Sequence, residues 1–468
     1  MPEYNKITSK ILNKLKEISG SENVFTDEET IKLCSKDETE DLTFAPEAVV
    51  KPASAKQISD IIKLANENLI PVTPRGGGTG LSGGALPVFG GIVISMEKFN
   101  KIIEIDEKNY QAVVEPGVIT QVFQEEVEKR GLFYPPDPAS RGSSFLGGNL
   151  AECSGGPRAV KYGVTKDYVL GLEAVLPTGE IINTGGRVLK NVSGYNLTQL
   201  IVGSEGTLGI ITKIIFRLIP LPKQKKVMLA AFNSFEDATD AVAKIFQMGI
   251  TPSAIEFMEK SAVKAAEEKQ NKKFPNGEAE AQLFIEVDGN YPELLDKDVE
   301  LIAGVISEYN PLDILLANEP QKVEDVWDLR RGIGEAVKSI SAYKEEDTVV
   351  PRANMTKLVK GVKEISKKYG ITTICYGHSG DGNIHVNILK DKLDDQTWEN
   401  TLDKAIREIF ELTVSLGGTI SGEHGIGYSQ KSYLPIALSE TELSVMKSIK
   451  NLFDPNNILN PGKIFITE

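Results

Sequence analysis

All three histidines of the 468-residue chain, His378, His385 and His424, lie in its last quarter, where they could bind a metal or move protons. Two of them fall in C-Y-G-H-S-G-D-G-N-I-H-V-N. Asp381-Gly382 is a favoured type I′ hairpin pair. If these two residues form the loop, position 380 pairs with 383, 379 with 384 and 378 with 385, which places the histidine Cβ atoms about 5 Å apart. That spacing suits two imidazoles on one metal ion; two unrelated polar strand residues are the alternative.

The third histidine adjoins a carboxylate in G-G-T-I-S-G-E-H-G-I-G. Glu423 could complete a face of two histidines and one carboxylate that leaves positions open for substrate, a pattern shared by catalytic zinc and non-haem iron sites. The metalloprotease helix motif is excluded because its second histidine is missing. His424 is then a candidate general base, since its unperturbed pKa lies near neutrality. A structural role is the alternative for this Glu-His pair.

A possible carboxylate-binding group lies in W-D-L-R-R, on a predicted helix. Arg330 or Arg331 could offer two parallel N–H donors to a substrate carboxylate. A solvated salt bridge explains either arginine equally well.

The stretch P-R-G-G-G-T-G-L-S-G-G-A, from Pro74 to Ala85, has six glycines in twelve residues. Glycine lets successive backbone N–H groups turn toward a phosphate, so the stretch predicts a phosphate cradle. A flexible linker is the alternative, but apolar segments flank the run. A Rossmann loop would open a helix, whereas A-L-P-V-F-G-G-I-V-I-S indicates a turn and a strand. A P-loop is excluded because no Gly-Lys-Ser/Thr follows.

The elements around the cradle indicate one small α+β lobe. An N-terminal helix with Ile7, Ile11 and Leu15 inward ends at Gly20, and Ser54-x-x-Gln57 is a plausible capping box for a second helix. With the cradle, strands at 92–95, 102–105 and 111–115 are expected to form this lobe, and a helix at 120–130 and strands at 172–176 and 210–218 follow it along the chain. Residues 135–171 read as a long ordered loop around a ligand, and a second glycine cluster, 203–209, could close on that ligand.

Pro220 and Pro222 mark the start of a second domain, in which strands and helices alternate without glycine clusters. Strand-like runs occur at 227–232, 254–258, 283–287, 314–317 and 371–376. The closing segment reads as one helix and a turn-rich tail.

Composition excludes several classes of function. Asp and Glu outnumber Lys and Arg by 66 to 52, a net charge of −14, which argues against a nucleic-acid binder. No stretch approaches the roughly 18 apolar residues of a membrane span, and the N-terminus has no apolar signal core, so we expect a cytoplasmic protein. Three scattered cysteines provide neither a disulfide framework nor an iron–sulfur cluster.

With these motifs placed, the chain resembles the FAD-linked oxidases and dehydrogenases of the vanillyl-alcohol oxidase superfamily over nearly its full length. It looks closest to the branch of D-lactate dehydrogenase, glycolate oxidase catalytic subunit and D-2-hydroxyglutarate dehydrogenase. The cradle carries this resemblance together with P-D-P-A-S, G-G-N-L-A-E-C-S-G-G-P-R-A-V-K-Y-G, G-S-E-G-T-L-G-I-I-T, the two histidine motifs and N-P-G-K. It implies an α+β fold: a two-lobed FAD-binding domain, an α+β cap domain for the substrate, and a C-terminal tail that returns to the FAD domain.

The expected divisions are an N-terminal helical segment (1–43), the FAD-binding domain (44–220), the cap domain with substrate and metal (221–427) and the C-terminal segment (428–468). By position, the resemblance makes His378, His385 and Glu423 ligands of a divalent metal (Fe²⁺, Zn²⁺ or Mn²⁺), His424 the base, and Arg330 and Asn387 substrate contacts. The residues that it implies for FAD binding are Pro74, Arg75, Gly76, Gly77, Gly78, Thr79, Gly80, Leu81, Ser82, Pro138, Gly147, Gly148, Asn149, Ser154, Gly155, Gly156, Tyr162, Gly163, Glu205, Gly206, Ile210 and Asn460.

The implied reaction is oxidation of a 2-hydroxy acid, best D-lactate to pyruvate, by hydride transfer to flavin N5, with electrons passed to an electron-transferring flavoprotein. No histidine precedes position 378, so FAD is expected to be held non-covalently. Glycolate and D-2-hydroxyglutarate are alternative substrates, and Lys344 or Arg352 could contact a second carboxylate. Two competing interpretations are a non-catalytic FAD relay subunit and a reductase of the cell-wall precursor type, although neither needs a metal site.

Overall fold

A computed structural model describes residues 3–317 and 320–466. The chain forms two compact units. Unit 1 comprises Met1–Ser154, Val164–Leu221 and Glu423–Glu468; unit 2 comprises Gly155–Gly163 and Pro222–Gly422. The chain therefore enters unit 2 twice, and its last segment returns to unit 1.

The first sheet of unit 1 has the order β1-β2-β4-β3, in which β2 and β3 both run parallel to β4. Its strands are β1 (Val24–Phe25), β2 (Ala48–Val50), β3 (Val72–Arg75) and β4 (Ile92–Ser95). Helices α1 (Ser9–Ser19), α2 (Glu28–Cys34) and α3 (Ala55–Glu67) accompany it, with the 3₁₀ turn η1 (Ser21–Asn23). Ser54 is confirmed as the N-cap, since its hydroxyl accepts a hydrogen bond from Gln57 N. The second bond of the predicted capping box differs, because Gln57 Oε1 accepts from Ala53 N and not from Ser54 N. Apolar side chains of α1 and α3 form one core with those of β3 and β4.

The second sheet of unit 1 is antiparallel, with the order β5-β6-β10-β8-β9. Its strands are β5 (Ile102–Asp106), β6 (Gln111–Val114), β8 (Val169–Val175), β9 (Ile181–Gly185) and β10 (Ile210–Arg217); β7 (Leu132–Phe133) pairs separately with β11 (Ile219–Pro220). The helices of this part are α4 (Thr120–Glu128), α5 (Leu146–Glu152), η2 (Thr165–Tyr168) and α7 (Leu197–Ile201), and the C-terminal segment adds α15 (Leu434–Ala437) and α16 (Glu440–Phe453). The expected long loop 135–171 thus contains short helices, which the glycines within α5 conceal in the sequence.

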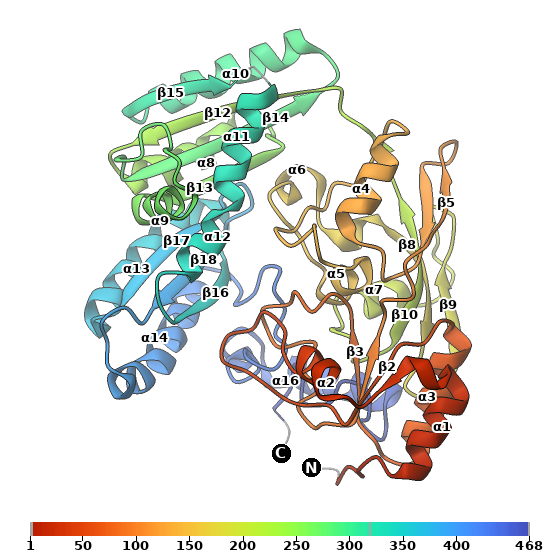
Figure 1. Cartoon of the computed structure of the whole chain (residues 1–468). Helices are drawn as coiled ribbons and strands as arrows, with labels where there is room; N and C mark the ends of the chain where they lie inside the picture. Colours follow the sequence, from red (N-terminus) through yellow and green to blue (C-terminus); the bar gives the residue numbers. More distant parts are fainter. Residues whose placement is uncertain (1–2, 318–319, 467–468) are drawn as a thin grey trace. The chain divides into compact units, whose positions relative to one another are not determined.

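Unit 2 is built on a seven-stranded antiparallel sheet with the order β15-β12-β14-β13-β17-β18-β16 (Figure 1). The strands are β12 (Gln224–Phe232), β13 (Ala254–Glu259), β14 (Ala281–Gly289), β15 (Pro311–Ala317), β16 (Tyr343–Val349), β17 (Thr372–His378) and β18 (Asn383–Leu389). The helices are α6 (Ala159–Tyr162), α8 (Phe235–Gln247), α9 (Lys260–Gln270), α10 (Pro292–Ser307), α11 (Pro320–Arg331), α12 (Ile333–Lys338), α13 (Met355–Tyr369) and α14 (Asp395–Ser415), with the 3₁₀ turn η3 (Arg352–Asn354).

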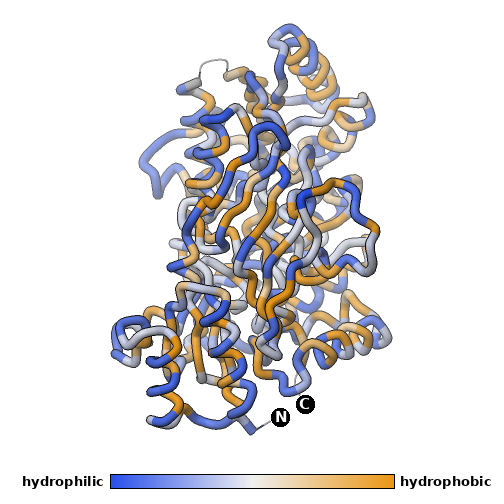
Figure 2. Tube along the Cα trace, turned by 90° about the vertical axis from the view of Figure 1, so that its right-hand side faces the viewer, coloured by the Kyte–Doolittle hydropathy of each residue, from blue (hydrophilic) through white to orange (hydrophobic). Residues whose placement is uncertain are grey.

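Helices α9, α11 and α12 share a hydrophobic core with one face of this sheet. Helix α8 contacts both α10 and α13, and all three helices contact the sheet. Hydrophobic and hydrophilic residues alternate along the helical segments in Figure 2, as expected for helices that cover a sheet with one side. The residues of this described core all belong to unit 2.

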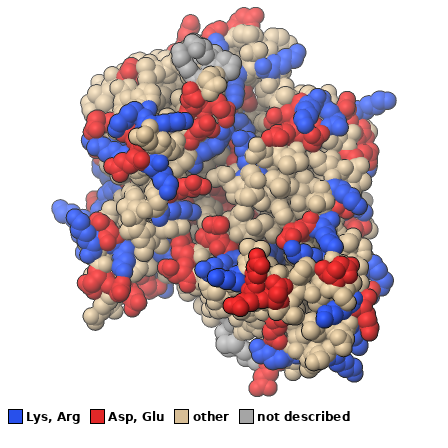
Figure 3. Space-filling model, viewed as in Figure 1, with Lys and Arg blue, Asp and Glu red and all other residues tan. Residues whose placement is uncertain are grey.

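Charges of both signs are interspersed on the face of each unit that Figure 3 shows. Among residues 3–317 and 320–466, no helix is long and apolar enough to span a bilayer.

Candidate functional site

The predicted phosphate cradle follows β3 and lies against residues 143–148. A Cβ atom built on Gly77 would come within 2.5 Å of Ser143 O, and one on Gly76 would lie 3.7 Å from Gly148 Cα. At Gly80 and Gly148, by contrast, a Cβ atom would meet nothing within 4 Å. Glycine is thus required at position 77, whereas a Cβ atom at position 76 would make an ordinary van der Waals contact, and open space adjoins the backbone at Gly80 and Gly148.

Two polar groups of the cradle suit an anionic ligand. Arg75 Nη1 is shielded from solvent and has no hydrogen-bond partner in the described part of the chain, while its Nη2 would lie 2.2 Å from a Cβ atom on Gly78. Ser82 Oγ is buried and also lacks a described partner. A shielded guanidinium nitrogen and a buried hydroxyl beside glycine backbone match the chemistry that a pyrophosphate needs.

The other predicted cofactor segments of unit 1 meet the cradle through the C-terminal tail. Asn460 Nδ2 donates to Gly84 O (3.0 Å) and to Glu205 O (2.8 Å), and a Cβ atom on Gly206 would lie 2.9 Å from Pro74 Cγ. Lys450 Nζ on α16 donates to Thr207 O at 2.9 Å. The predicted return of the tail to the domain that holds the cradle is confirmed.

Glu205 has a contact that its sequence motif does not reveal. Its backbone is left-handed (φ 52°), and its carboxylate accepts hydrogen bonds from Ile426 N (2.8 Å) and Gly427 N (2.6 Å). These two residues follow Glu423-His424, in which Glu423 Oε1 and His424 Nε2 are 4.0 Å apart. Glu205 therefore fixes the loop that carries the predicted base.

A second carboxylate, Glu152, packs against the same loop. Its oxygens would lie 2.7 Å and 2.1 Å from Cβ atoms built on Gly84 and Gly425. Its Oε2 is shielded from solvent and has no partner among the described residues. Burial, and then the neighbouring Glu205 and Asp37, raise the pKa of Glu152 well above its ordinary value.

The remaining predicted cofactor residues divide between the units. Ile210 opens β10, Asn149 Nδ2 donates to Thr120 Oγ1 (2.6 Å), and Thr79, Leu81, Pro138, Gly147 and Ser154 also belong to unit 1. Gly155, Gly156, Tyr162 and Gly163 belong to unit 2. There the Tyr162 hydroxyl is 2.8 Å from Asp288 Oδ2.

The histidine hairpin forms with a different register from the predicted one. His378 pairs with Asn383 and His385 pairs with Tyr376, so four residues, 379–382, form the loop. The predicted pairing of 378 with 385 is therefore wrong, because Ser379 and Gly380 belong to the loop and not to the strands. Both histidines nevertheless lie on one face of the sheet as diagonal neighbours. Their ring centroids are 5.2 Å apart and the rings are nearly perpendicular.

A buried carboxylate on the neighbouring strand contacts both a histidine and the predicted substrate arginine. Glu256 on β13 has no exposed surface, its Oε1 and Oε2 lie 2.8 and 3.0 Å from His378 Nδ1, and its Oε2 accepts from Arg330 Nη2. Burial by itself would raise the pKa of Glu256, but His378 and the Arg330 guanidinium together hold that pKa below its usual value. The Arg330 guanidinium also lies over the Tyr376 ring.

Two further acids reach this face from β16. Asp347 pairs with His385 across the strands and Glu345 pairs with Asn387. His385 Nδ1 lies 3.6 Å from Glu345 Oε1 and 3.7 Å from Asp347 Oδ1. Asn387 is fully buried, and neither polar atom of its amide makes a well-aligned hydrogen bond in the described chain, although the amide interacts with the nearby Tyr376 hydroxyl. The face thus joins two imidazoles, buried acids, an arginine and an available amide.

Sequence reasoning missed Glu256, Glu345 and Asp347. The available signal was a carboxylate inside the apolar strand run A-I-E-F-M. The β16 sequence Y-K-E-E-D-T-V gives no such contrast, since most of its residues are polar.

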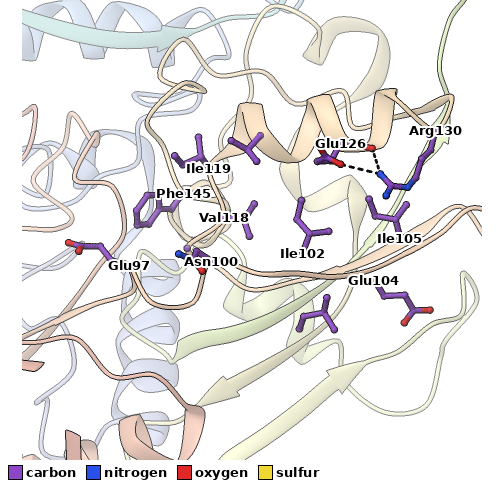
Figure 4. A pocket seen from close by; sticks show the side chains of 13 residues that line it. Glu97, Asn100, Ile102, Glu104, Ile105, Val118, Ile119, Glu126, Arg130 and Phe145 are labelled. Atoms are coloured by element: carbon purple, nitrogen blue, oxygen red, sulfur yellow. Dashed lines mark hydrogen bonds and ion pairs between the residues drawn. The ribbon is translucent and has the colours of Figure 1, made fainter. Parts of the chain in front are cut away.

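Unit 1 also has an open pocket of ≈ 740 Å³ beside β5 and α4 (Figure 4). Isoleucine and valine side chains form much of its wall, and Glu126 and Arg130 at its rim pair with each other. None of the predicted catalytic, cofactor or metal residues lines this pocket, so we exclude it from the candidate site.

Comparison with known proteins relates both parts of the chain to flavoproteins. Residues 46–185 match the FAD binding domain family, and residues 221–464 match the C-terminal domain of FAD linked oxidases. The chain is 41% identical to glycolate oxidase subunit GlcD of Bacillus subtilis over 98% of its own length and 97% of the relative's. It is 37% identical to D-lactate dehydrogenase of Anaerostipes hadrus, covering 99% and 98% of the two chains.

Solved structures share the fold at lower identity. p-Cresol methylhydroxylase superposes with a TM-score of 0.81 at 20% identity, covering 100% of this chain and 99% of that one. Alkyldihydroxyacetonephosphate synthase gives 0.75 at 21% identity, covering 98% and 86%. The predicted FAD-binding fold of vanillyl-alcohol oxidase type is confirmed.

Proposed function

The chain belongs to the FAD-linked oxidases and is an oxidoreductase, and we propose that it oxidises a small 2-hydroxy acid, with D-lactate to pyruvate as its preferred reaction. The observation that carries the proposal is the polar face of unit 2, where two histidines, a buried arginine and Asn387 lie together in an FAD-dependent chain. Relatives named glycolate oxidase subunit, D-lactate dehydrogenase and D-2-hydroxyglutarate dehydrogenase support this class of substrate.

We assign His378, His385 and Glu423 to a divalent cation, Fe²⁺, Zn²⁺ or Mn²⁺, which two imidazoles and a carboxylate accept. Chain connectivity supports the third ligand. Gly422 N donates to Asp347 Oδ2 at 2.8 Å, Asp347 pairs with His385, and Glu423 is the next residue along the chain. Such a cation would lower the pKa of a substrate hydroxyl.

Each polar side chain then has one task. Bound FAD supplies the acceptor for two electrons from the substrate's Cα–H. His424 takes the hydroxyl proton, and the loop that carries it is held by Glu205. Arg330 and Asn387 orient the substrate: Arg330 Nε is shielded and lacks a described partner, so it can donate to a carboxylate while Nη2 remains on Glu256.

The placement of two other cations favours a monocarboxylic acid. Lys344 pairs with Ile388, and strand alternation puts it on the face opposite Glu345 and His385. The Arg352 guanidinium lies 3.6 Å from the centre of the Phe246 ring. Strand register therefore keeps Lys344 off the histidine face, and Arg352 is engaged with Phe246, which supports lactate or glycolate over 2-hydroxyglutarate.

We further propose that FAD is bound non-covalently and that electrons pass to an electron-transferring flavoprotein. All histidines lie at or beyond position 378. Burial raises the pKa of the Cys153 thiol, which disfavours the reactive thiolate. Three cysteines cannot ligate an iron–sulfur cluster of their own, which supports transfer of the electrons to a separate partner.

An anaerobic titration of the FAD-loaded protein tests the proposal. D-lactate, L-lactate, glycolate and D-2-hydroxyglutarate are added in turn while the flavin absorbance is recorded, with and without added Zn²⁺ or Mn²⁺. We expect D-lactate to bleach the flavin bands most rapidly, and His424→Asn to slow bleaching at least 100-fold while FAD stays bound. Bleaching by none of the four acids would reject the 2-hydroxy-acid reaction and favour a relay subunit.

A further inference from the structure

Glu256 is the most deeply buried acid beside the two histidines, and no task has yet been assigned to it. We propose that Glu256 is a positioning residue: its carboxylate fixes His378 with a proton on Nδ1, which presents Nε2 to the cation, and the same carboxylate holds the guanidinium of Arg330. The inference rests on the proposed function, because it assigns the cation to His378.

Hydrogen-bond chemistry supplies the first step. An ionised carboxylate only accepts, and both Glu256 oxygens lie within 3.0 Å of His378 Nδ1, so Nδ1 must be the donor. The lone pair of a neutral imidazole is then on Nε2. Metal-binding histidines commonly donate their second N–H to a carboxylate in this way, which fixes the tautomer and the ring orientation.

The sheet register supplies the second step. Phe257 pairs with Gly377, so Glu256 stands directly beside His378 on the adjacent strand. Strand β13 lies between β14 and β17 in the sheet, and this central position leaves the Glu256 backbone little freedom to move. The contact is therefore a product of the strand pairing and does not depend on a flexible loop.

Charge supplies the third step. A carboxylate without exposed surface needs donors on both oxygens, and Glu256 finds them in His378 and Arg330. One buried anion thus connects the proposed metal ligand with the proposed carboxylate-binding group. If His378 or Arg330 moved away, the buried Glu256 carboxylate would lose a hydrogen-bond donor. Both side chains are therefore held in place by the same carboxylate.

Glu286 offers a matched control on the next strand. It is also buried, at 1% exposure, and lies on the same face, where it accepts from Trp327 Nε1 (2.8 Å) and Ser253 Oγ (3.0 Å). Its described partners include no imidazole. Replacing Glu286 changes a buried carboxylate of the same core without touching His378.

The first experiment uses the unaltered protein, whose three histidines give few signals. The ¹⁵N-histidine-labelled, FAD-loaded protein is saturated with Zn²⁺, and long-range ¹H–¹⁵N spectra are recorded, with His378→Asn used only to assign the signal. We expect His378 to carry its proton on Nδ1 and to show a zinc-shifted Nε2. Zinc on Nδ1, or a proton on Nε2, would overturn the inference whether or not any Glu256 variant folds.

The second experiment compares Zn²⁺ affinity in Glu256→Gln and Glu286→Gln by competition with a chromophoric chelator, with FAD content and melting temperature measured in parallel. The glutamine NH₂ would confront either Nδ1–H or the guanidinium, so we expect Glu256→Gln to bind Zn²⁺ 10- to 100-fold more weakly, and Glu286→Gln to match the wild type. Equal affinity in all three proteins overturns the role of Glu256 but leaves the metal site in place. Absence of stoichiometric Zn²⁺ in the wild type rejects the metal site itself, and the inference with it.

Discussion

At the scale of single residues, burial raises the pKa of both carboxylates beside the His424 loop, but Glu205 also accepts two backbone hydrogen bonds, so replacing Glu152 and Glu205 should have opposite effects on stability. Glu152 ionises with difficulty, since burial and Glu205 raise its pKa, whereas its pKa in the unfolded chain is ordinary. The unfolded state therefore loses this proton first as pH rises above about 4.5, and wild-type stability falls with pH. We expect Glu152→Gln to gain stability relative to the wild type between pH 5 and pH 8, by up to about 1.4 kcal/mol per pH unit.

Urea unfolding at saturating FAD, at pH 5 and pH 8, measures this difference. Glu205→Gln is the contrasting variant, because Glu205 accepts from two backbone N–H groups and glutamine has only one acceptor atom. We expect it to lose about 1–3 kcal/mol. If Glu152→Gln changes the free energy of unfolding by the same amount at pH 5 and at pH 8, Glu152 is ionised in the folded protein and the prediction is wrong.

Some residues of the site could be predicted from the sequence, whereas a contact between distant positions could not. The histidines and Glu423-His424 were found because their types and short spacings carry chemical information. Glu256 lies 122 positions from His378, and only the β13–β17 pairing brings them together. No local pattern encodes that contact.

At the scale of elements, the β17–β18 hairpin depends on a close approach at Gly382. This glycine has φ +88°, and a Cβ atom on it would lie 2.0 Å from Val350 O. We expect Gly382→Ala to cost about 2–4 kcal/mol and to weaken Zn²⁺ binding, since the clash displaces the end of the hairpin next to His378. Gly370→Ala is the matched control: its φ of +65° is similar but its Cβ atom would meet nothing within 4 Å, so its cost should be about 1 kcal/mol with unchanged Zn²⁺ affinity.

The C-terminal tail gives a second prediction at this scale. Asn460 donates to carbonyls of two cofactor loops, so Asn460→Ala should destabilise the protein by about 1–3 kcal/mol and weaken FAD binding. Asn456→Ala removes an exposed contact with Asn66 and should stay within about 0.5 kcal/mol of the wild type. Equilibrium dialysis measures the FAD affinity of the two variants, and thermal unfolding measures their stability. Equal FAD affinity in Asn460→Ala and Asn456→Ala would contradict the prediction that Asn460 holds the two cofactor loops together.

Helices and strands were predicted correctly where the hydrophobic pattern of the sequence is regular, and were mispredicted or missed where polar and apolar residues are mixed or a turn is ambiguous. The strand at Ile92–Ser95 and the helix that starts at Thr120 are confirmed, because an apolar run and an amphipathic period mark them. The hairpin register was wrong by two residues because a favoured turn pair, Asp381-Gly382, occupies only half of a four-residue loop. Strand β16 was missed because its alternating acids face the histidines and not a hydrophobic core.

At the scale of the whole molecule, each unit has its own core and its own buried cysteine. Cys34 packs with Val49 and Val93 in unit 1, and Cys375 lies on β17 in unit 2. Burial raises the pKa of both thiols, that of Cys375 to about 12, so alkylation at pH 8 requires opening of the surrounding unit. The two thiols therefore report separately on the two units.

Because most of the predicted FAD-binding residues, among them the cradle, the Glu205–Gly206 segment and Asn460, belong to unit 1, FAD should protect Cys34 more than Cys375. Iodoacetamide labelling in moderate urea, followed peptide by peptide with mass spectrometry, measures both rates. With free FAD at 100 times its Kd, we expect labelling of Cys34 to slow by about 100-fold, and that of Cys375 to slow by clearly less. Equal slowing at both thiols would mean that the two units open as one cooperative body, in which FAD binding energy reaches the histidine face as well as the cradle.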